Sequence, residues 1–384
     1  MKRSHANTAW PVGLAAAALL VVACGNLAPP PAARVLATRD LGPLPFLPVI
    51  QGRDGGYSAG WAGRSVWVFG DTTLAHAAAD GNTWRSSTFC ATSDRDASDG
   101  LSGLDEPVDA SGAPGELLPF TPDEQAFNDA HFSPAAQATC TQDCDARWAL
   151  WPGPLLPDPD GAGSALLFYA KISARPGAFN FSGVGTSLAT WADPSARPVR
   201  PALAPGAAEP TLLFGADEPA FAAAALVVRG DLIAYACEGG LDSPCILARV
   251  PYAQALDRGA WTFYAGGSAW SSDVHDAAYV MNGATMMTVA WNEAIGAYLA
   301  VYSAPVSSDV RFRTAPAPEG PWSQARLLFH AEPPVDASDW TYSGLAHDEL
   351  ADERGARQYV SYFRSTGFLQ GEMRLVEVRL AQEQ

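Results

Sequence analysis

Two aspartates near the start of the sequence are placed for acid–base chemistry. Both lie in GRDGGYSAGWAGRSVWVFGDT, a stretch typical of a β-hairpin with a tight turn at Ala62 and Gly63. An antiparallel register about that turn sets Asp54 directly opposite Asp71, with Cβ atoms about 4.5 to 5.5 Å apart. Like charges that close are unfavourable, and the pKa of one aspartate should rise. The pairing therefore predicts chemistry, although each aspartate alone could instead cap or brace a turn.

The same hairpin recurs along the chain. FAAAALVVRGDLIAYACE repeats it about Arg229 and Gly230, and Glu238 follows that glycine at the distance at which Asp71 follows Gly63. Further strand-like units are SALLFYAKI, MMTVAWNEAIGAYLAVYS and YSGLAHDELADERGARQYVSYF. Gly and Pro punctuate short β-branched and aromatic runs throughout, which indicates an all-β protein. Units of about 45 residues favour a five-bladed β-propeller with four-stranded blades, with a β-sandwich as the alternative.

These hairpins would gather polar side chains at one mouth of the propeller channel. In each blade the first strand starts and the second strand ends on the same face, which places Asp54 and Asp71 at one mouth. The other blades would add a larger set to that face: Trp151, Lys171, Glu238, His275, Tyr342 and His347. Sugar hydrolysis requires an acid, a base or nucleophile, and rings that stack on sugar faces. We predict Asp54, Asp71 and Glu238 as catalytic residues and the rest as substrate-binding residues.

Structural roles are the alternatives for several of these residues. Glu238 could be a solvated loop residue, and Trp151, which precedes a proline, could pack between blades. His275 and His347 could be histidines whose hydrogen bonds are satisfied within the fold. For the two aspartates, their joint placement argues against a purely structural role.

Cysteine usage agrees with an exported protein. Cys237 and Cys245 bracket a Gly-rich loop and are predicted to form a disulfide. One thiol must remain unpaired among Cys90, Cys140 and Cys144, and the sequence does not show which two of them pair. The spacing of Cys and His shows no zinc-binding pattern.

A long acidic insertion, residues 91–147, follows the first blade. Its first part carries ten acidic residues against one arginine, which predicts a solvated loop. A short helix is expected in TPDEQAFNDAHF, with Thr121 as N-cap and Glu124 completing a capping box. Calcium binding by these carboxylates is the less favoured alternative, because their spacing fits no EF-hand.

The N-terminal residues are typical of a lipoprotein export signal. A short basic segment precedes an apolar run that is too short to span a bilayer and that ends in the lipobox-like VVACGN. We predict a signal peptide over residues 1–23, lipidation of Cys24, a Pro/Ala-rich tether over residues 24–45 and a propeller domain over residues 46–384. A buried core helix with an ordinary thiol is the alternative. By resemblance to sorting in diderm bacteria, Gly25 favours the outer membrane or cell surface.

The charge balance restricts the partners. The net charge is -17, and nucleic acid and anionic membrane surfaces both require a basic face that this chain does not supply. We expect a monomer that touches the membrane through its lipid anchor alone and whose partner is a polysaccharide.

Several segments carry a family resemblance. They are GRDGGYSAGWAGRSVWVFGDT, FNDAHF with CTQDCDARWALWPG, LARVPY with WTFYAGGSAWSSD, YLAVYS with RTAPAPEGPWS, and YVSYFRSTGFLQGEMRLVEVRL. These segments, within residues 46–380, resemble a family of secreted five-bladed propeller proteins of largely unknown function. That family is related to arabinanase-like glycoside hydrolases and includes endo-D-arabinanases.

The resemblance implies a site and an activity. An aspartate pair in the first blade carries the chemistry of the hydrolytic members, and it maps onto Asp54 and Asp71. A third carboxylate has no clear match: Glu238 is the first candidate, and Glu209 and Glu293 are weaker ones. No cofactor is required, although the related clan often holds a central calcium through a histidine, which here would be His347 or His275.

The expected function is that of a cell-surface glycoside hydrolase. It would cut within a furanose-containing polysaccharide such as arabinan by paired-carboxylate chemistry, and its retaining or inverting outcome stays open. The alternatives are a surface lipoprotein that binds carbohydrate without cleaving it and an adhesion module that uses the acidic insertion. Fold and function separate readily, so the site has to decide between them.

Overall fold

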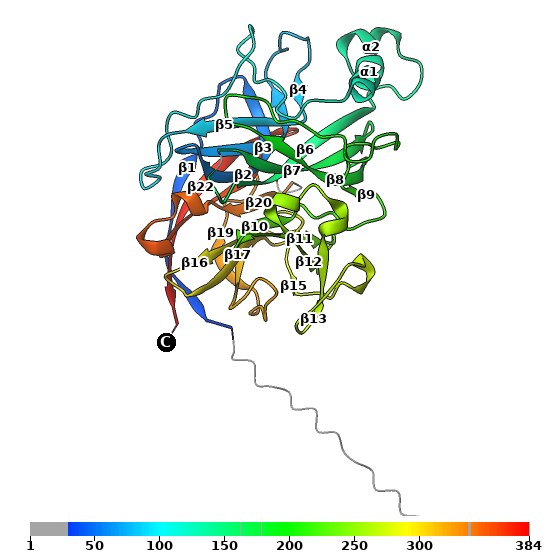
Figure 1. The fold of residues 1–384 in the computed structure, drawn as a ribbon. Helices are drawn as coiled ribbons and strands as arrows, with labels where there is room; N and C mark the ends of the chain where they lie inside the picture. The colour runs from blue at the N-terminus through cyan, green and yellow to red at the C-terminus, as the bar shows by residue number, and fades with distance from the viewer. Residues whose placement is uncertain (1–29, 162, 178, 337–338, 384) are drawn as a thin grey trace, which may run out of the picture.

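The computed structural model describes residues 30–161, 163–177, 179–336 and 339–383. The predicted signal peptide and Cys24 lie outside the described residues. The described chain forms five antiparallel sheets arranged around a centre, which confirms the five-bladed β-propeller (Figure 1). Within these ranges no helix is long and apolar enough to cross a membrane.

Each blade is one sheet, and four of the five consist of strands that are consecutive in the chain. Blade 1 contains β2 (Ile50–Trp61), β3 (Arg64–Leu74), β4 (Trp84–Arg85) and β5 (Thr88–Thr92). Blade 2 contains β6 (Arg147–Pro157), β7 (Ala165–Ala174), β8 (Phe181–Trp191) and β9 (Phe214–Gly215). Blade 3 contains β10 (Ala224–Val228), β11 (Asp231–Cys237), β12 (Pro244–Pro251) and β13 (Thr262–Gly266), extended by β14 (Ala269–Ser271) and β15 (Met281–Asn282). Blade 4 contains β16 (Met287–Asn292), β17 (Ala297–Ser303), β18 (Asp309–Ala315) and β19 (Arg326–His330).

Blade 5 joins the two ends of the described chain. Its strands are β20 (Thr341–Ala346), β21 (Arg357–Gly367), β22 (Gln370–Gln382) and, outermost, β1 (Ala33–Pro43). Figure 1 shows β1 and β22 side by side. The first strands of the five blades, β2, β6, β10, β16 and β20, contact one another in ring order and so form the wall of the channel.

Strand β1 corrects the predicted tether. Residues 33–43 are not a free linker, because they pair along β22 and Ala33 is buried. Most of β1 is exposed on the outer edge of the blade, so the strand needs few apolar side chains and has no clear alternating pattern. Ion pairs of Arg39 with Glu377 and of Asp40 with Arg374 fix it in place. The propeller domain therefore starts before Ala33 and not at residue 46.

The predicted hairpin turns are confirmed. Ala62 and Gly63 link β2 to β3 with φ of 50° and 76°, and Arg229 and Gly230 link β10 to β11 with φ of 53° and 89°. Positive φ at both central residues is the hairpin turn whose twist matches that of the flanking strands. These local turns set the register of the blades from which the channel is built.

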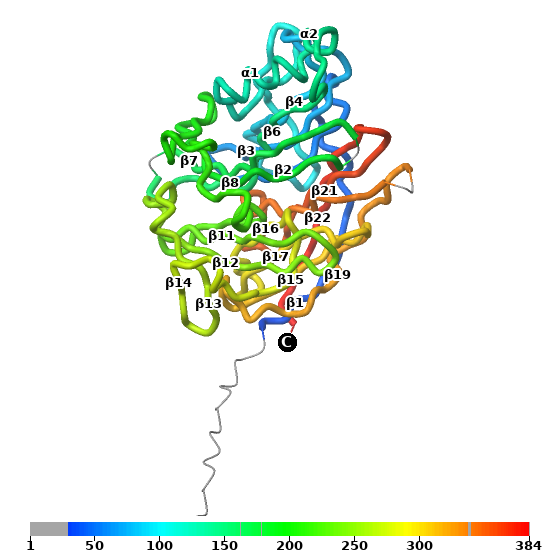
Figure 2. Tube along the Cα trace, turned by 90° about the vertical axis from the view of Figure 1, so that its right-hand side faces the viewer, coloured from blue at the N-terminus to red at the C-terminus, as the bar shows by residue number. Residues whose placement is uncertain are grey.

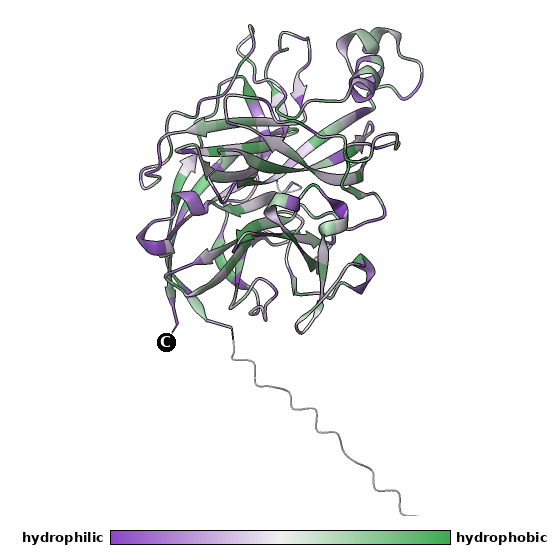
Figure 3. Ribbon diagram, in the orientation of Figure 1, coloured by the Kyte–Doolittle hydropathy of each residue, from purple (hydrophilic) through white to green (hydrophobic). Residues whose placement is uncertain are grey.

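Apolar side chains pack between neighbouring blades. Separate buried clusters join blades 1 and 2, 2 and 3, 3 and 4, 4 and 5, and 5 and 1. Figure 3 shows the most hydrophobic stretches along the strands and hydrophilic residues in the peripheral loops. Five apolar interfaces thus close the ring, and each blade takes part in two of them.

The acidic insertion is folded onto blades 1 and 2. It contains α1 (Pro122–His131) and α2 (Pro134–Thr139), and α1 has the predicted capping box of Thr121 and Glu124. Figure 2 shows both helices next to β4 and β6. The prediction of a solvated loop was wrong, because several of its carboxylates are buried against cations or hydroxyls, Glu124 and Glu116 among them. Its first two residues also belong to β5, and Arg147 begins β6.

The structure contains the predicted disulfide and a second one among the cysteines whose pairing was left open. Cys237 and Cys245 form the predicted disulfide across β11 and β12. Cys140 and Cys144 form a second disulfide beside α2. The remaining thiol, Cys90, is buried on β5 and free.

Candidate active site

Asp54 and Asp71 lie near each other, but not directly opposite. The predicted register holds from the turn as far as Tyr57, which pairs with Val68. Bulges on both sides of Gly55 then shift the pairing, so the prediction of direct opposition was wrong. Gly55 has a φ of 85°, a left-handed conformation that a regular β-strand does not contain. Bulges of this kind re-aim side chains and are over-represented beside active sites.

The bulge leaves Asp54 close enough to Asp71 for the two residues to interact. The Asp54 carboxylate accepts a hydrogen bond from the backbone of Asp71, and the charge of Asp71 acts on it directly. A Cβ added at Gly70 would lie 2.5 Å from Asp54 Oδ1. Glycine at position 70 therefore leaves the space that the Asp54 carboxylate occupies.

Asp54 is half-buried at the channel mouth and holds its proton tightly. Desolvation by burial, followed by the charge of Asp71, raises the pKa of Asp54 to about 7. The Tyr342 hydroxyl donates a hydrogen bond of 3.2 Å to Asp54 Oδ2, which opposes the rise. Tyr342 comes from β20 in blade 5, so two neighbouring blades form this half of the site.

Asp71 is half-buried as well, but its neighbours favour the charged form. Burial raises the pKa of Asp71 to about 6, while the charge of Arg147 and hydrogen bonds from Trp151 and Trp84 limit the rise. Trp151 Nε1 donates to Asp71 Oδ1 at 2.9 Å. Arg147 is held between the rings of Trp84 and Phe132, with its guanidinium carbon 4.2 and 4.8 Å from their centroids.

The two environments divide the roles of the pair. Asp71 loses its proton before Asp54 does, because cationic and N–H donors surround it. Two carboxyl groups whose environments separate their pKa values are the usual arrangement of an acid and a base or nucleophile. The pKa of both carboxyl groups is raised by burial, and the Arg147 charge and N–H donors favour the charged form of Asp71 over that of Asp54.

Of the predicted substrate-binding residues, the structure brings Trp151 and Tyr342 to the pair. Lys171 lies on β7 but is buried, and its ammonium group pairs with Glu124 at 2.9 Å and with Glu209. It also lies 4.4 Å from the ring centroid of Trp148. Lys171 thus has anionic partners of its own and acts as a structural cation.

The predicted third carboxylate is not joined to the pair by any contact in the described chain. Glu238 is exposed, and its carboxylate accepts a hydrogen bond of 2.8 Å from Tyr279. Glu209 binds Lys171, and Glu293 is exposed and binds Arg354. The repeat alignment located the end of β11 correctly but not the direction of the side chain.

The two histidines do not lie beside the aspartates. His347 is fully buried beyond the end of β20, where Nδ1 lies 2.6 Å from Ser58 Oγ and the ring lies against Trp67. Burial lowers the pKa of His347 to about 3, so the ring is neutral. His275 is exposed in the short helix Val274–Asp276, on the outer side of blade 3.

A calcium ion held by protein side chains does not fit these residues. His347 Nε2 is a buried atom that has no hydrogen-bond partner in the described chain. Calcium requires six or more oxygen ligands, and no three His, Cys, Asp or Glu side chains of the described residues converge to hold a metal.

Sequence reasoning missed three residues that shape the site: Arg147, Trp84 and Phe132. Tertiary packing brings these residues near the aspartates. The insertion folds back on blade 1, so that Phe132 and Trp84 meet edge to face with ring centroids 5.4 Å apart. The hairpin repeat says nothing about such contacts. Phe181 was also missed, and it packs edge to face on Trp151 at 5.0 Å.

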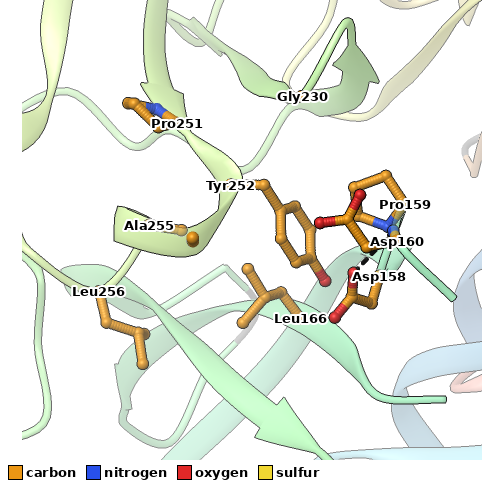
Figure 4. Close-up of a pocket in the computed structure, with 10 residues that line it drawn as sticks. Asp158, Pro159, Asp160, Leu166, Gly230, Pro251, Tyr252, Ala255 and Leu256 are labelled. Carbon is orange, nitrogen blue, oxygen red and sulfur yellow. Dashed lines mark hydrogen bonds between the residues drawn. The ribbon is translucent and has the colours of Figure 1, made fainter. Parts of the chain in front are cut away.

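A well-formed hollow lies away from the aspartates. It has a volume of about 360 Å³ between the β6–β7 turn and the short helix Tyr252–Gln254 (Figure 4). Its polar groups are already paired, since Tyr252 donates to the Leu156 carbonyl at 2.9 Å and Asp158 accepts from the Asp160 backbone at 2.9 Å. Its contacts belong to the junction between blades 2 and 3.

Family comparison supports the fold. Residues 180–364 match the family described as Domain of unknown function (DUF4185). Over these residues the chain is similar to that family, and the match covers a little under half of the sequence. The matched residues begin after the aspartate pair, so the assignment of the pair rests on geometry. No curated protein matches the sequence significantly.

Several solved structures are similar to this chain. A candidate hydrolase from Bacteroides ovatus ATCC 8483 is 15% identical, with 88% of this chain and 87% of that chain covered and a TM-score of 0.57. A GH43_1 enzyme from Xanthomonas citri is 14% identical over 91% and 90% of the two chains, with a TM-score of 0.45. A family 117 glycoside hydrolase from Zobellia galactanivorans is 10% identical over 89% and 90%, with a TM-score of 0.49. At such identities the first of these likenesses establishes the fold alone.

Proposed function

We propose that this protein is a glycoside hydrolase that cuts within a furanose-containing polysaccharide such as arabinan. The observation that carries the proposal is the half-buried pair of Asp54 and Asp71, whose pKa values of about 7 and about 6 suit a proton donor and a charged partner. Aromatic rings beside the pair suit the apolar faces of sugars. The sugar class follows from the sequence resemblance to arabinanase-like propellers.

Asp71 is the nucleophile in this proposal and Asp54 the acid. A carboxylate oxygen of Asp71 attacks the anomeric carbon while Asp54 gives its proton to the departing glycosidic oxygen. Water then attacks the anomeric carbon, its proton returns to Asp54, and the bond to Asp71 breaks. The electrostatic interaction between the two groups supports this retaining route, because a retaining pair is about 5 to 5.5 Å apart whereas an inverting pair needs about 6.5 to 9.5 Å for the water.

The neighbours of the pair position it for these steps. Arg147 and the Trp151 N–H keep Asp71 charged, and the Trp151 hydrogen bond fixes which oxygen faces the substrate. Tyr342 orients Asp54 through its hydroxyl. These are positioning roles, and only the two aspartates touch the reacting atoms.

The test is product release from arabinans, arabinogalactan and other furanans by the purified protein. We expect oligosaccharides from at least one polymer, loss of product in Asp71→Asn, and retention of anomeric configuration by NMR. Asp158→Asn, which alters a carboxylate of the β6–β7 turn, is the control and should retain activity. Binding to a polymer without any product would instead support the carbohydrate-binding alternative.

We also propose that Cys24 tethers the protein to the outer membrane or cell surface. Because β1 begins at Ala33, the tether after Cys24 is short and holds the propeller close to the membrane. Labelling of cells with a radioactive fatty acid should mark the wild-type protein and not Cys24→Ser. Equal labelling of the two proteins would refute lipidation at Cys24.

A further inference from the structure

Two exposed aromatic rings from different blades meet just before strands β8 and β20. Phe179 precedes β8 in blade 2, and Trp340 precedes β20 in blade 5. Their ring centroids are 5.1 Å apart, with an interplanar angle of 38°. Phe179 is 67% exposed and Trp340 is 41% exposed, although both are large apolar side chains. We call this pair the aromatic bridge.

The aromatic bridge closes a circuit of contacts around the candidate site. Phe179 lies two residues before Phe181, which packs on Trp151, the ring that donates to Asp71. Trp340 lies two residues before Tyr342, which donates to Asp54. Each half of the bridge thus lies two residues from a side chain that is linked to one of the two carboxyl groups, through Trp151 in one case and directly in the other.

Hydrogen bonds hold the loops that carry the bridge. Asn180, next to Phe179, donates from Nδ2 to the Pro176 carbonyl at 2.9 Å. The Trp340 backbone N–H donates to Asp339 Oδ1 at 2.9 Å, and Ser365 donates to the other oxygen of Asp339. The rings are therefore presented to solvent by anchored backbone, a form of preorganisation that reduces the entropy lost on binding.

We propose that the aromatic bridge is a sugar-stacking subsite that holds the polysaccharide beside the bond to be cleaved. This proposal rests on the proposed function and names residues that select long substrates. Carbon atoms in contact are about 3.5 to 4.0 Å apart, so a sugar sandwiched between two rings would separate them by about 7 Å. At 5.1 Å the two rings touch each other, and the sugar stacks on their exposed faces.

This geometry gives a dependence on chain length. A sugar that occupies the aspartate pair alone does not reach the bridge, whereas a polymer through the same mouth extends over it. Removal of the bridge should therefore weaken turnover of polymers and leave a short chromogenic glycoside unaffected. A structural role in folding would affect both substrates equally.

The experiment compares Phe179→Ala, Trp340→Ala and Trp340→Phe with the wild type. Trp291→Ala is the matched control, because Trp291 is 48% exposed and has a ring partner, Tyr298, at 5.2 Å on blade 4. We expect each alanine variant to raise KM for the polymer about tenfold, with Trp340→Phe near the wild type. The control and the melting temperatures should not change.

The outcomes separate the two proposals. If the wild type cleaves polymers and both alanine variants match its polymer KM, the subsite is refuted while the hydrolase proposal stands. If the wild type binds a polymer without cleaving it, the hydrolase proposal fails, and loss of binding by the alanine variants in affinity electrophoresis still supports the subsite. If the wild type neither binds nor cleaves any polymer, both proposals fall.

Discussion

Replacement of Asp54 with asparagine should stabilise the folded protein at neutral pH. Burial and the charge of Asp71 raise the pKa of Asp54 from 3.8 to about 7. A difference of about three pH units corresponds to about 4 kcal/mol between the folded and unfolded states. Asparagine has nearly the same shape, carries no charge and keeps an oxygen that can accept the Tyr342 hydrogen bond.

The sign of the effect follows from proton binding. The folded state binds the Asp54 proton more tightly than the unfolded state, so its contribution to stability is fully present below about pH 4 and is lost as the pH rises to about 7. The asparagine variant has no such loss. The difference in unfolding free energy should therefore be near zero at about pH 4, about 2 kcal/mol at pH 5 and about 4 kcal/mol at pH 8.

Urea denaturation followed by tryptophan fluorescence measures this difference at each pH. Asp193→Asn is the control, because hydrogen bonds from Ser195 lower the pKa of Asp193 at an exposed turn, and its replacement should instead destabilise the protein above about pH 4. A difference between wild type and Asp54→Asn that does not change with pH would refute the description of Asp54 as a desolvated acid.

Three further predictions follow from the same contacts. The kcat/KM profile should be bell-shaped, rising through about pH 6 as Asp71 ionises and falling above about pH 7 as Asp54 loses its proton. Arg147→Gln should shift the acidic limb of this profile to higher pH, because the Arg147 charge lowers the pKa of Asp71. Gly70→Ala places a Cβ 2.5 Å from Asp54 Oδ1 and should lower kcat about a hundredfold in steady-state assays with little change in melting temperature. A chain that starts at residue 46 lacks β1 and should melt well below one that starts at residue 30, as measured by circular dichroism, because β22 then presents a bare edge.

The blades could be predicted from the sequence because each hairpin turn depends on two adjacent residues. Ala62 with Gly63 and Arg229 with Gly230 fix their hairpins within a few residues, and the repeats follow from them. The outer strand β1 was missed because an exposed edge strand is held by backbone pairing and ion pairs, which leave little pattern in its side chains.

The sequence predicted only those parts of the site that follow from the pairing of β2 with β3. Asp54 and Asp71 were brought together by the shared strand geometry, but the bulge at Gly55 alters their separation in a way that counting from the turn cannot show. Glu238 occupies the matching position in blade 3, and there the side chain points to solvent and Tyr279. Equivalent positions in a repeat share backbone geometry and need not share side-chain direction.

The acidic insertion explains why the charge at the site falls on Asp71. Glu106 neutralises Arg53, which is next to Asp54 in sequence, through a bidentate pair with both side chains fully buried. Glu124 in the same insertion neutralises Lys171 and Arg200.

Arg147 differs from these cations, because the carboxylates that act on it are Asp71 and Asp145. Phe132 from the end of α1 presses its guanidinium against Trp84, within reach of Asp71. The insertion thus pairs three cations with its own carboxylates and directs a fourth, Arg147, onto one member of the pair. Phe132→Ala should therefore raise the acidic limb of the pH profile without any contact to substrate, and an unchanged limb would show that Arg147 is held by other groups.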